Sequence, residues 1–141
     1  MRKKLEEEYL ADSLKGRIKY FLTHYRKAHD ATSRVAIRLD GEEILCGNWF
    51  QSARYGWPLL NDELMDLGAF DQGSFNRAFQ EFDNQSIEQS LESEDLLVRI
   101  LAILDRRIGK RRLLQMKETI QDEAINFQTF FAIRMEAEEL S

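Results

Sequence analysis

The sequence has only one cysteine, one proline and no long apolar run, so it has few residues that could form disulfides, kink helices or span a membrane. No run approaches the roughly 18 apolar residues that span a bilayer, so we expect no membrane association. The charged first residues are not followed by an apolar segment, which predicts no secretory signal. Cys46 has no second thiol for a disulfide or a zinc knuckle, and its strand-like neighbours predict a buried structural thiol. These absences fit a cytoplasmic protein.

Several well-known catalytic motifs are also missing. The sequence has no glycine-rich phosphate loop, no G-x-S-x-G elbow, no paired-cysteine motif and no dinucleotide-binding fingerprint. We therefore expect no cofactor and no metal site, and a binding protein is favoured over an enzyme.

The composition is that of a globular domain. The 141 residues are 43% hydrophobic and 32% charged, and no linker rich in Gly, Pro or Ser divides them. A chain of this length can bury a core without staples. We predict a single domain over residues 1–141, with a helix and a β-meander to about residue 50 and a helical layer from about residue 58. The net charge of −5 argues against a dedicated nucleic-acid-binding domain, which is usually strongly basic.

Alternating apolar and polar residues predict strands over residues 17–25 and 34–39. Asp40-Gly41 is typical of a two-residue type I′ hairpin, because glycine adopts positive φ without steric cost. A third strand that returns from this turn gives an antiparallel meander. The predicted register pairs Arg38 with Glu43, Ile37 with Ile44 and Val35 with Cys46.

Helical patterns dominate the rest of the sequence. A short first helix is predicted over Lys3–Ala11, the strongest apolar stripe runs from Leu96 to Ile108, and a last helix covers Asp122–Glu139. The predicted helix caps are Asn61 or Asp62, Ser74, Ser86 and Ser93. Strands followed by helices predict an α+β fold, in which a three-stranded antiparallel meander packs against four to six helices.

Positive charge is concentrated in two segments. Residues 15–38 contain seven Lys or Arg against one acid, and residues 105–112 contain five against one. Residues 59–95 contain ten acids and one base. The basic segments favour an anionic partner, although cations near a helix end can also simply stabilise its dipole.

Our first hypothesis is therefore a non-enzymatic binding module whose basic sheet surface contacts nucleic acid or an acidic protein surface. Arg34 and Arg38 alternate with Val35 and Ile37, which places the two arginines on the face opposite the apolar residues. The predicted binding residues are Arg17, Lys19, Tyr25, Arg26, Lys27, Arg34, Arg38, Arg106, Arg107, Lys110 and Arg111.

A second hypothesis is a small enzyme that acts on an anionic substrate. His24 or His29 would act as the general base, Asp30 would orient it, and Arg26 would hold the anion. The alternative is that these residues are exposed polar groups at a strand end, with no catalytic role.

Aromatic residues suggest two further roles. Trp49, Phe50, Tyr55 and Trp57 could stack bases or anchor a peptide, or else fill the gap between the sheet and its helices. A third hypothesis is a homo-oligomer that associates through Phe127, Phe130 and Phe131.

Three segments together resemble a family of small, uncharacterised bacterial proteins. They are Ala11–Arg17 (ADSLKGR), Tyr25–Asp30 (YRKAHD) leading into the Asp40-Gly41 hairpin, and Leu104–Arg111 (LDRRIGKR). The resemblance spans most of the chain. It implies a bacterial, soluble, single-domain protein, and it assigns no activity and no site residues.

Overall fold

The computed structural model describes residues 1–24, 33–56 and 59–140, with the exception of the side chains of Thr23, His24 and Ser33. Three strands form an antiparallel sheet in the order β1-β2-β3: β1 (Ile18–His24), β2 (Ser33–Leu39) and β3 (Glu42–Asn48). Asp40 and Gly41 have φ angles of 51° and 89°, as a type I′ turn requires. The predicted α+β fold and its three-stranded antiparallel meander are confirmed.

The predicted hairpin register is correct only next to the turn. Arg38 pairs with Glu43, but a β-bulge then shifts the register by one residue, so that Ile37 pairs with Leu45 and Ala36 with Cys46. The predicted pairs of Ile37 with Ile44 and of Val35 with Cys46 are therefore wrong. The bulge turns Leu45 toward the core and places Cys46 on the other face of the sheet. As a result Cys46 is exposed, not buried as predicted.

The helical half contains more and shorter segments than the sequence pattern suggests. The α-helices are α1 (Arg2–Lys4), α2 (Trp49–Tyr55), α3 (Asp62–Asp66), α4 (Gln72–Asp83), α5 (Ile87–Leu91), α6 (Leu96–Ile103), α7 (Lys110–Met116) and α8 (Ile125–Ala137). A π-helical turn, η1 (Leu5–Tyr9), continues α1, and two 3-10 turns are η2 (Asp12–Leu14) and η3 (Ile120–Asp122).

Side chains cap several helices, although not always those predicted. Asn61 caps α3, and Ser86 with Gln89 forms a complete capping box on α5, as expected. The cap of α4 is Asp71 instead of Ser74, and the cap of α6 is Asp95 instead of Ser93. In both helices a carboxylate accepts a free amide of the first turn, that of Ser74 in α4 and that of Leu97 in α6.

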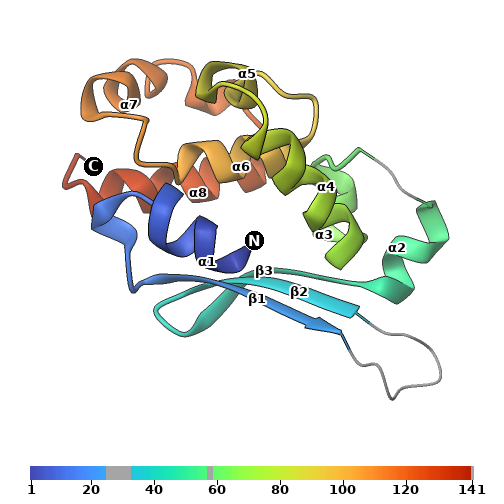
Figure 1. Cartoon of the computed structure of the whole chain (residues 1–141). Helices are drawn as coiled ribbons and strands as arrows, with labels where there is room; N and C mark the ends of the chain where they lie inside the picture. The colour runs from blue at the N-terminus through green and yellow to red at the C-terminus, as the bar shows by residue number, and fades with distance from the viewer. Residues whose placement is uncertain (25–32, 57–58, 141) are drawn as a thin grey trace.

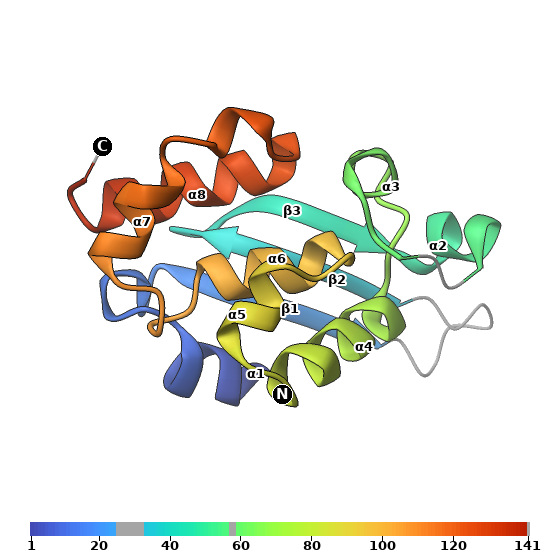
Figure 2. The same cartoon turned by 90° about the horizontal axis from the view of Figure 1, so that it is seen from above.

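The fold is layered. Helices α4, α6 and α8 and the N-terminal segment cover one face of the sheet, and no helix of the described residues covers the other face (Figure 1). Seen from above, α6 crosses the sheet between α4 and α8 (Figure 2). No helix in the described part of the chain is both long and apolar enough to cross a membrane.

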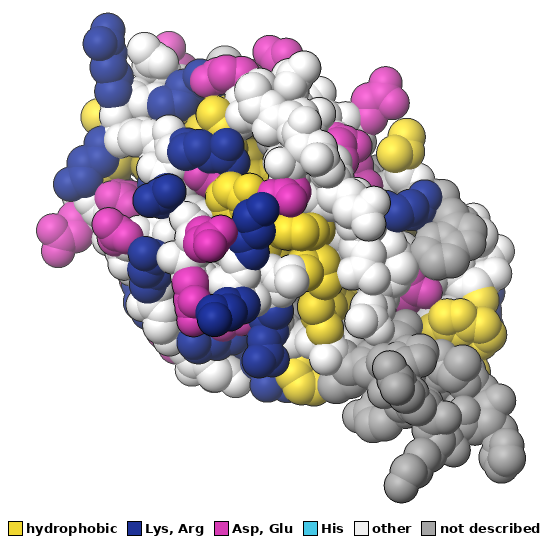
Figure 3. Space-filling model, in the orientation of Figure 1, with side chains coloured by type: hydrophobic (Ala, Val, Ile, Leu, Met, Phe, Trp, Pro, Cys, Tyr) yellow, Lys and Arg dark blue, Asp and Glu magenta, His cyan; other side chains and the backbone are white. Residues whose placement is uncertain are grey.

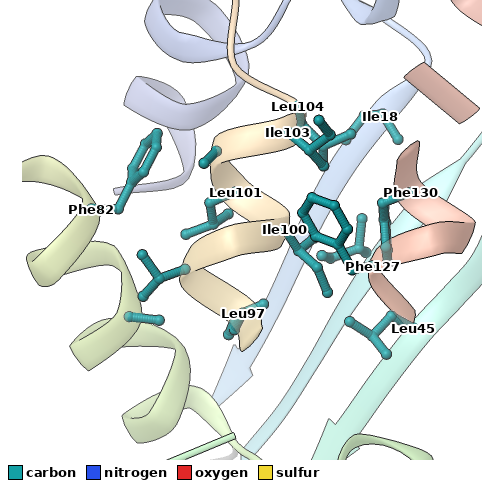
Figure 4. Packing of buried hydrophobic residues seen from close by; sticks show 14 of the residues in the cluster. Ile18, Leu45, Phe82, Leu97, Ile100, Leu101, Ile103, Leu104, Phe127 and Phe130 are labelled. Atoms are coloured by element: carbon teal, nitrogen blue, oxygen red, sulfur yellow. The ribbon is translucent and has the colours of Figure 1, made fainter. Parts of the chain in front are cut away.

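Helix α6 is the centre of the hydrophobic core (Figure 4). Leu97, Ile100 and Ile103 are fully buried there between Phe82 of α4 and Phe127 and Phe130 of α8. From the sheet, Ile18 and Leu45 reach the same cluster. Each such side chain contributes about 1.5–3 kcal/mol of transfer free energy. The three phenylalanines of α8 therefore hold the chain's own core together.

Candidate anion-binding surface

The uncovered face of the sheet carries Arg34 and Arg38, as the alternation in β2 predicts. Both guanidinium groups bind the carboxylate of Glu43, Arg34 at 2.8 Å and Arg38 at 3.2 Å. The Arg38 guanidinium also lies 4.1 Å from the centre of the Phe21 ring, within cation–π range. The Arg34 hydrogen bond to Glu43 is the main reason that the pKa of this carboxyl lies below its usual value, since it stabilises the ionised form. The two arginines are thus partly neutralised within the protein.

The other two described cations of the predicted sheet surface are also paired. Arg17 binds Asp40 through two parallel hydrogen bonds of 3.1 Å, which lowers the pKa of the Asp40 carboxyl. Lys19 lies 3.5 Å from Glu6. Glu6 also accepts the outward main-chain N–H of Tyr20, so the N-terminal segment covers the free edge of β1.

The remaining predicted residues of the first basic segment lie outside the described residues. They are Tyr25, Arg26, Lys27, His29 and Asp30, together with the side chain of His24. The catalytic hypothesis for this loop therefore stays a prediction. Trp57 also lies outside the described residues.

The second basic segment divides into paired and unpaired cations. Arg107 makes a bidentate pair of 3.0 Å with the buried carboxylate of Asp105, and its guanidinium lies 5.1 Å from the Tyr9 ring. Arg112 pairs with Glu88 at 2.8 Å. In contrast, Arg106, Lys110 and Arg111 are exposed, and their side chains have no ion pair or hydrogen bond with any described residue.

A cavity lies between the N-terminal helix and the start of β1. We call it the N-terminal cleft; its volume is about 530 Å³. Its lining residues are Arg2, Lys3, Glu6, Glu7, Lys15, Gly16 and Lys19. Four cations therefore surround two carboxylates. Lys15 and Lys19 belong to the predicted basic run, whereas no local pattern predicts that Arg2 and Lys3 lie beside them.

A second, smaller pocket of about 230 Å³ lies where the N-terminal segment meets the chain after α6. We call it the junction pocket; Asp12, Ser13, Arg106, Lys110 and Glu138 are among its lining residues. The Ala11 amide donates to the carbonyl of Leu104 at 2.9 Å, and the Arg106 amide donates to the carbonyl of Tyr9 at 2.8 Å. Two segments that carry the family resemblance, residues 11–17 and 104–111, thus meet in space.

Two residues that support the junction pocket were not predicted. Arg134 is buried and donates to the main-chain carbonyls of Ile103, Asp105 and Ile108. It also binds Glu138 at 3.1 Å, and Glu138 accepts a 2.6 Å hydrogen bond from Ser13. Burial opposes ionisation of Glu138, but these hydrogen bonds outweigh it and lower the pKa of the carboxyl. Arg134 thus satisfies a carbonyl in the last turn of α6 and two in the segment that follows it.

The aromatic residues predicted to fill a gap or bind a partner divide into an exposed group and a buried group. Trp49, Phe50 and Tyr55 lie on α2 and are 38%, 53% and 48% exposed, so they do not fill the space between the sheet and the helices. Phe127, Phe130 and Phe131 are buried, so an interface between copies would need other side chains.

Charges of both signs are interleaved on the surface that includes the N-terminal segment. Figure 3 shows Lys and Arg side chains gathered over one half of this face, with Asp and Glu between them. The unpaired cations beside the junction pocket and the cations of the N-terminal cleft flank the same turn, η2. We call these seven residues the basic band: Arg2, Lys3, Lys15, Lys19, Arg106, Lys110 and Arg111.

Comparison with known proteins identifies the family. No curated protein and no solved structure matches the chain significantly. The model of one family, described as the SF0329 protein family, matches residues 1–58 and 51–135. These matches include both segments that form the junction pocket. The chain belongs to the SF0329 protein family.

Proposed function

We propose that this chain is a non-enzymatic binding module of a bacterial cytoplasm, which binds an anionic partner through the basic band. Nucleic acid and an acidic protein surface both have the required charge. The observation that carries the proposal is the N-terminal cleft, where Arg2, Lys3, Lys15 and Lys19 outnumber Glu6 and Glu7. A concave site with an excess of one charge concentrates ligands of the opposite charge.

The pairing of the other cations supports the basic band over the uncovered sheet face. Arg34 and Arg38 would have to leave Glu43 before they could bind an external anion. Lys3, Arg106, Lys110 and Arg111 have no such competitor within the described ranges of the chain. An anion at these four residues breaks no existing ion pair, whereas Arg2, Lys15 and Lys19 of the basic band are already paired with Glu6 or Asp12.

The test is fluorescence anisotropy at low salt with two labelled probes, oligodeoxythymidine and oligoglutamate. The variants K3Q/K15Q and K110Q/R111Q each remove two charges from the basic band. Each should weaken the binding of whichever probe binds by about fivefold to tenfold, because an exposed ion pair contributes at most about 1 kcal/mol.

The matched control is R34Q/R38Q, which removes two positive charges from the sheet face. It should retain the affinity of the unmodified protein for the probe. If R34Q/R38Q weakens binding and the two basic-band variants do not, the sheet face is the binding surface. A separate variant, E43Q, removes the carboxylate that Arg34 and Arg38 share and should strengthen weak anion binding at the sheet face.

A further inference from the structure

We infer that the partner of the basic band is an acid-rich polypeptide that lies across the turn η2, in contact with the N-terminal cleft and the junction pocket together. The inference rests on the proposed function and narrows its partner to one class. It is carried by the position of the two pockets and by the carboxylates that each of them contains.

The two pockets are adjacent along the chain and in space. Asp12 and Ser13 line the junction pocket, whereas Lys15 and Gly16 line the N-terminal cleft. An ion pair of 3.1 Å between Lys15 and Asp12 links the two sides of the turn. One extended ligand that crosses η2 therefore reaches both groups of cations, and its second contact becomes intramolecular once the first has formed.

Each pocket also contains two carboxylates: Glu6 and Glu7 in the N-terminal cleft, and Asp12 and Glu138 in the junction pocket. Two of them are held in place by the fold. Glu6 accepts the Tyr20 amide at 3.3 Å, and Glu138 accepts hydrogen bonds from Ser13 and Arg134. A ligand therefore meets two fixed carboxylates, Glu6 and Glu138, and two exposed ones, Glu7 and Asp12, between the cations.

This alternation discriminates between the two classes of polyanion. A nucleic acid has a phosphate at every nucleotide, so some phosphates would lie beside these carboxylates, and like charges at close range are costly. A polypeptide can place an acid opposite a cation and a neutral residue opposite a carboxylate. Gly16 adds an accessible main chain, because no atom lies within 4 Å of the position that a Cβ would take there.

The experiment compares two labelled probes of equal net charge by anisotropy across a salt series. One is a peptide in which glutamates alternate with serines, and the other is oligodeoxythymidine. The peptide should bind about tenfold more tightly, and K3Q/K15Q and K110Q/R111Q should each reduce its affinity several-fold. Combined in one protein, the four substitutions should reduce binding to background.

A selectivity variant tests the role of the carboxylates directly. E7Q/D12N removes the two exposed carboxylates, which have no role in holding the fold beyond the Asp12–Lys15 pair. It should raise the affinity for the oligonucleotide about tenfold and narrow the preference for the peptide. The matched control E42Q/E94Q removes two exposed carboxylates elsewhere and should leave the preference unchanged.

The outcomes separate the two proposals. If neither probe binds, or if K3Q/K15Q and K110Q/R111Q both leave the affinity for the probes unchanged, the proposed function is wrong. If the oligonucleotide binds more tightly than the peptide through the same lysines and arginines, the proposed function stands and the acid-rich polypeptide is the wrong partner. A preference for the peptide that E7Q/D12N does not change also overturns the inference, because the carboxylates would then not discriminate.

Discussion

Arg134 donates a 2.8 Å hydrogen bond to the main-chain carbonyl of Asp105, which lies 29 residues earlier in the sequence, just after the core helix α6. The same guanidinium binds the carbonyls of Ile103 and Ile108 and the carboxylate of Glu138. One buried side chain thus connects α8 to the whole segment between α6 and α7.

Replacement of this arginine should destabilise the protein strongly. R134A leaves buried carbonyls without their donor and leaves Glu138 with Ser13 but without its cation, which costs about 3–5 kcal/mol of unfolding free energy. The stability of R134K should lie between that of R134A and that of the unmodified protein, because lysine keeps the positive charge but lacks the planar guanidinium group. Urea unfolding measures the effect, and R111A, at an exposed arginine, should change stability by less than about 0.5 kcal/mol. Equal stabilities for R134A and R111A would contradict the structural role.

The phenylalanines of α8 should act within one chain. F130A empties a fully buried site in the core and should cost about 3–5 kcal/mol, with a clear fall in Tm. I125A on the same helix is the control, since Ile125 is 66% exposed, and it should have little effect. Light scattering on both variants should give the same mass as the unmodified protein. A mass change in F130A without a loss of stability would instead favour an interface between copies.

Gly47 of β3 lies against Phe70, in the chain before α4. A Cβ at this position would lie 2.2 Å from the carbonyl oxygen of Phe70 and 2.7 Å from its ring. G47A should therefore cost about 3 kcal/mol or more, because main chain as well as a side chain must move. G109A meets no atom within 4 Å and should be nearly neutral in the same thermal melt. If G47A and G109A have the same Tm, β3 can shift away from Phe70.

The cap of α6 should make stability depend on pH. Burial raises the pKa of Asp95 to about 6, against the lowering effect of the Leu97 amide that it accepts. The folded state therefore holds this proton more tightly than the unfolded chain, in which the pKa is about 3.8. The resulting stabilisation is complete below about pH 4 and is lost as the pH rises through about 6.

D95N tests this linkage, since asparagine keeps the capping oxygen and cannot ionise. Relative to the unmodified protein, D95N should become more stable by up to about 3 kcal/mol between pH 4 and pH 7.5. Urea unfolding at several pH values measures the difference in stability between D95N and the unmodified protein. The contributions of all other titratable groups cancel in this difference. A difference that is the same at every pH would show that Asp95 does not titrate in this window.

The hairpin illustrates what local pattern can and cannot predict. Alternation and the Asp40-Gly41 turn identify β2 and β3, because both signals lie within a few residues. The bulge beyond Arg38 was missed, since the choice between Ile44 and Leu45 as the inward residue depends on α8 and the other core elements. The exposure of Cys46 follows from that one shift.

The candidate site shows the same limit. The cations are visible in the sequence, but the carboxylates that pair with them are distant in it: Glu6 for Lys19, Asp40 for Arg17 and Glu43 for Arg34. Which cations remain unpaired is therefore decided by tertiary structure. Arg134 is a single base in an acidic terminal segment, and no local signal distinguishes a buried arginine from a solvated one.

The junction between residues 11–13 and the chain after α6 also bears on synthesis at the ribosome. Ala11 has its main-chain partner at Leu104, and Ser13 has its hydroxyl partner at Glu138. Residues 11–13 therefore wait for residues translated more than ninety positions later before these two contacts exist. This junction therefore cannot form until the chain beyond residue 104 has been made, and in the interval residues 11–13 are without these partners.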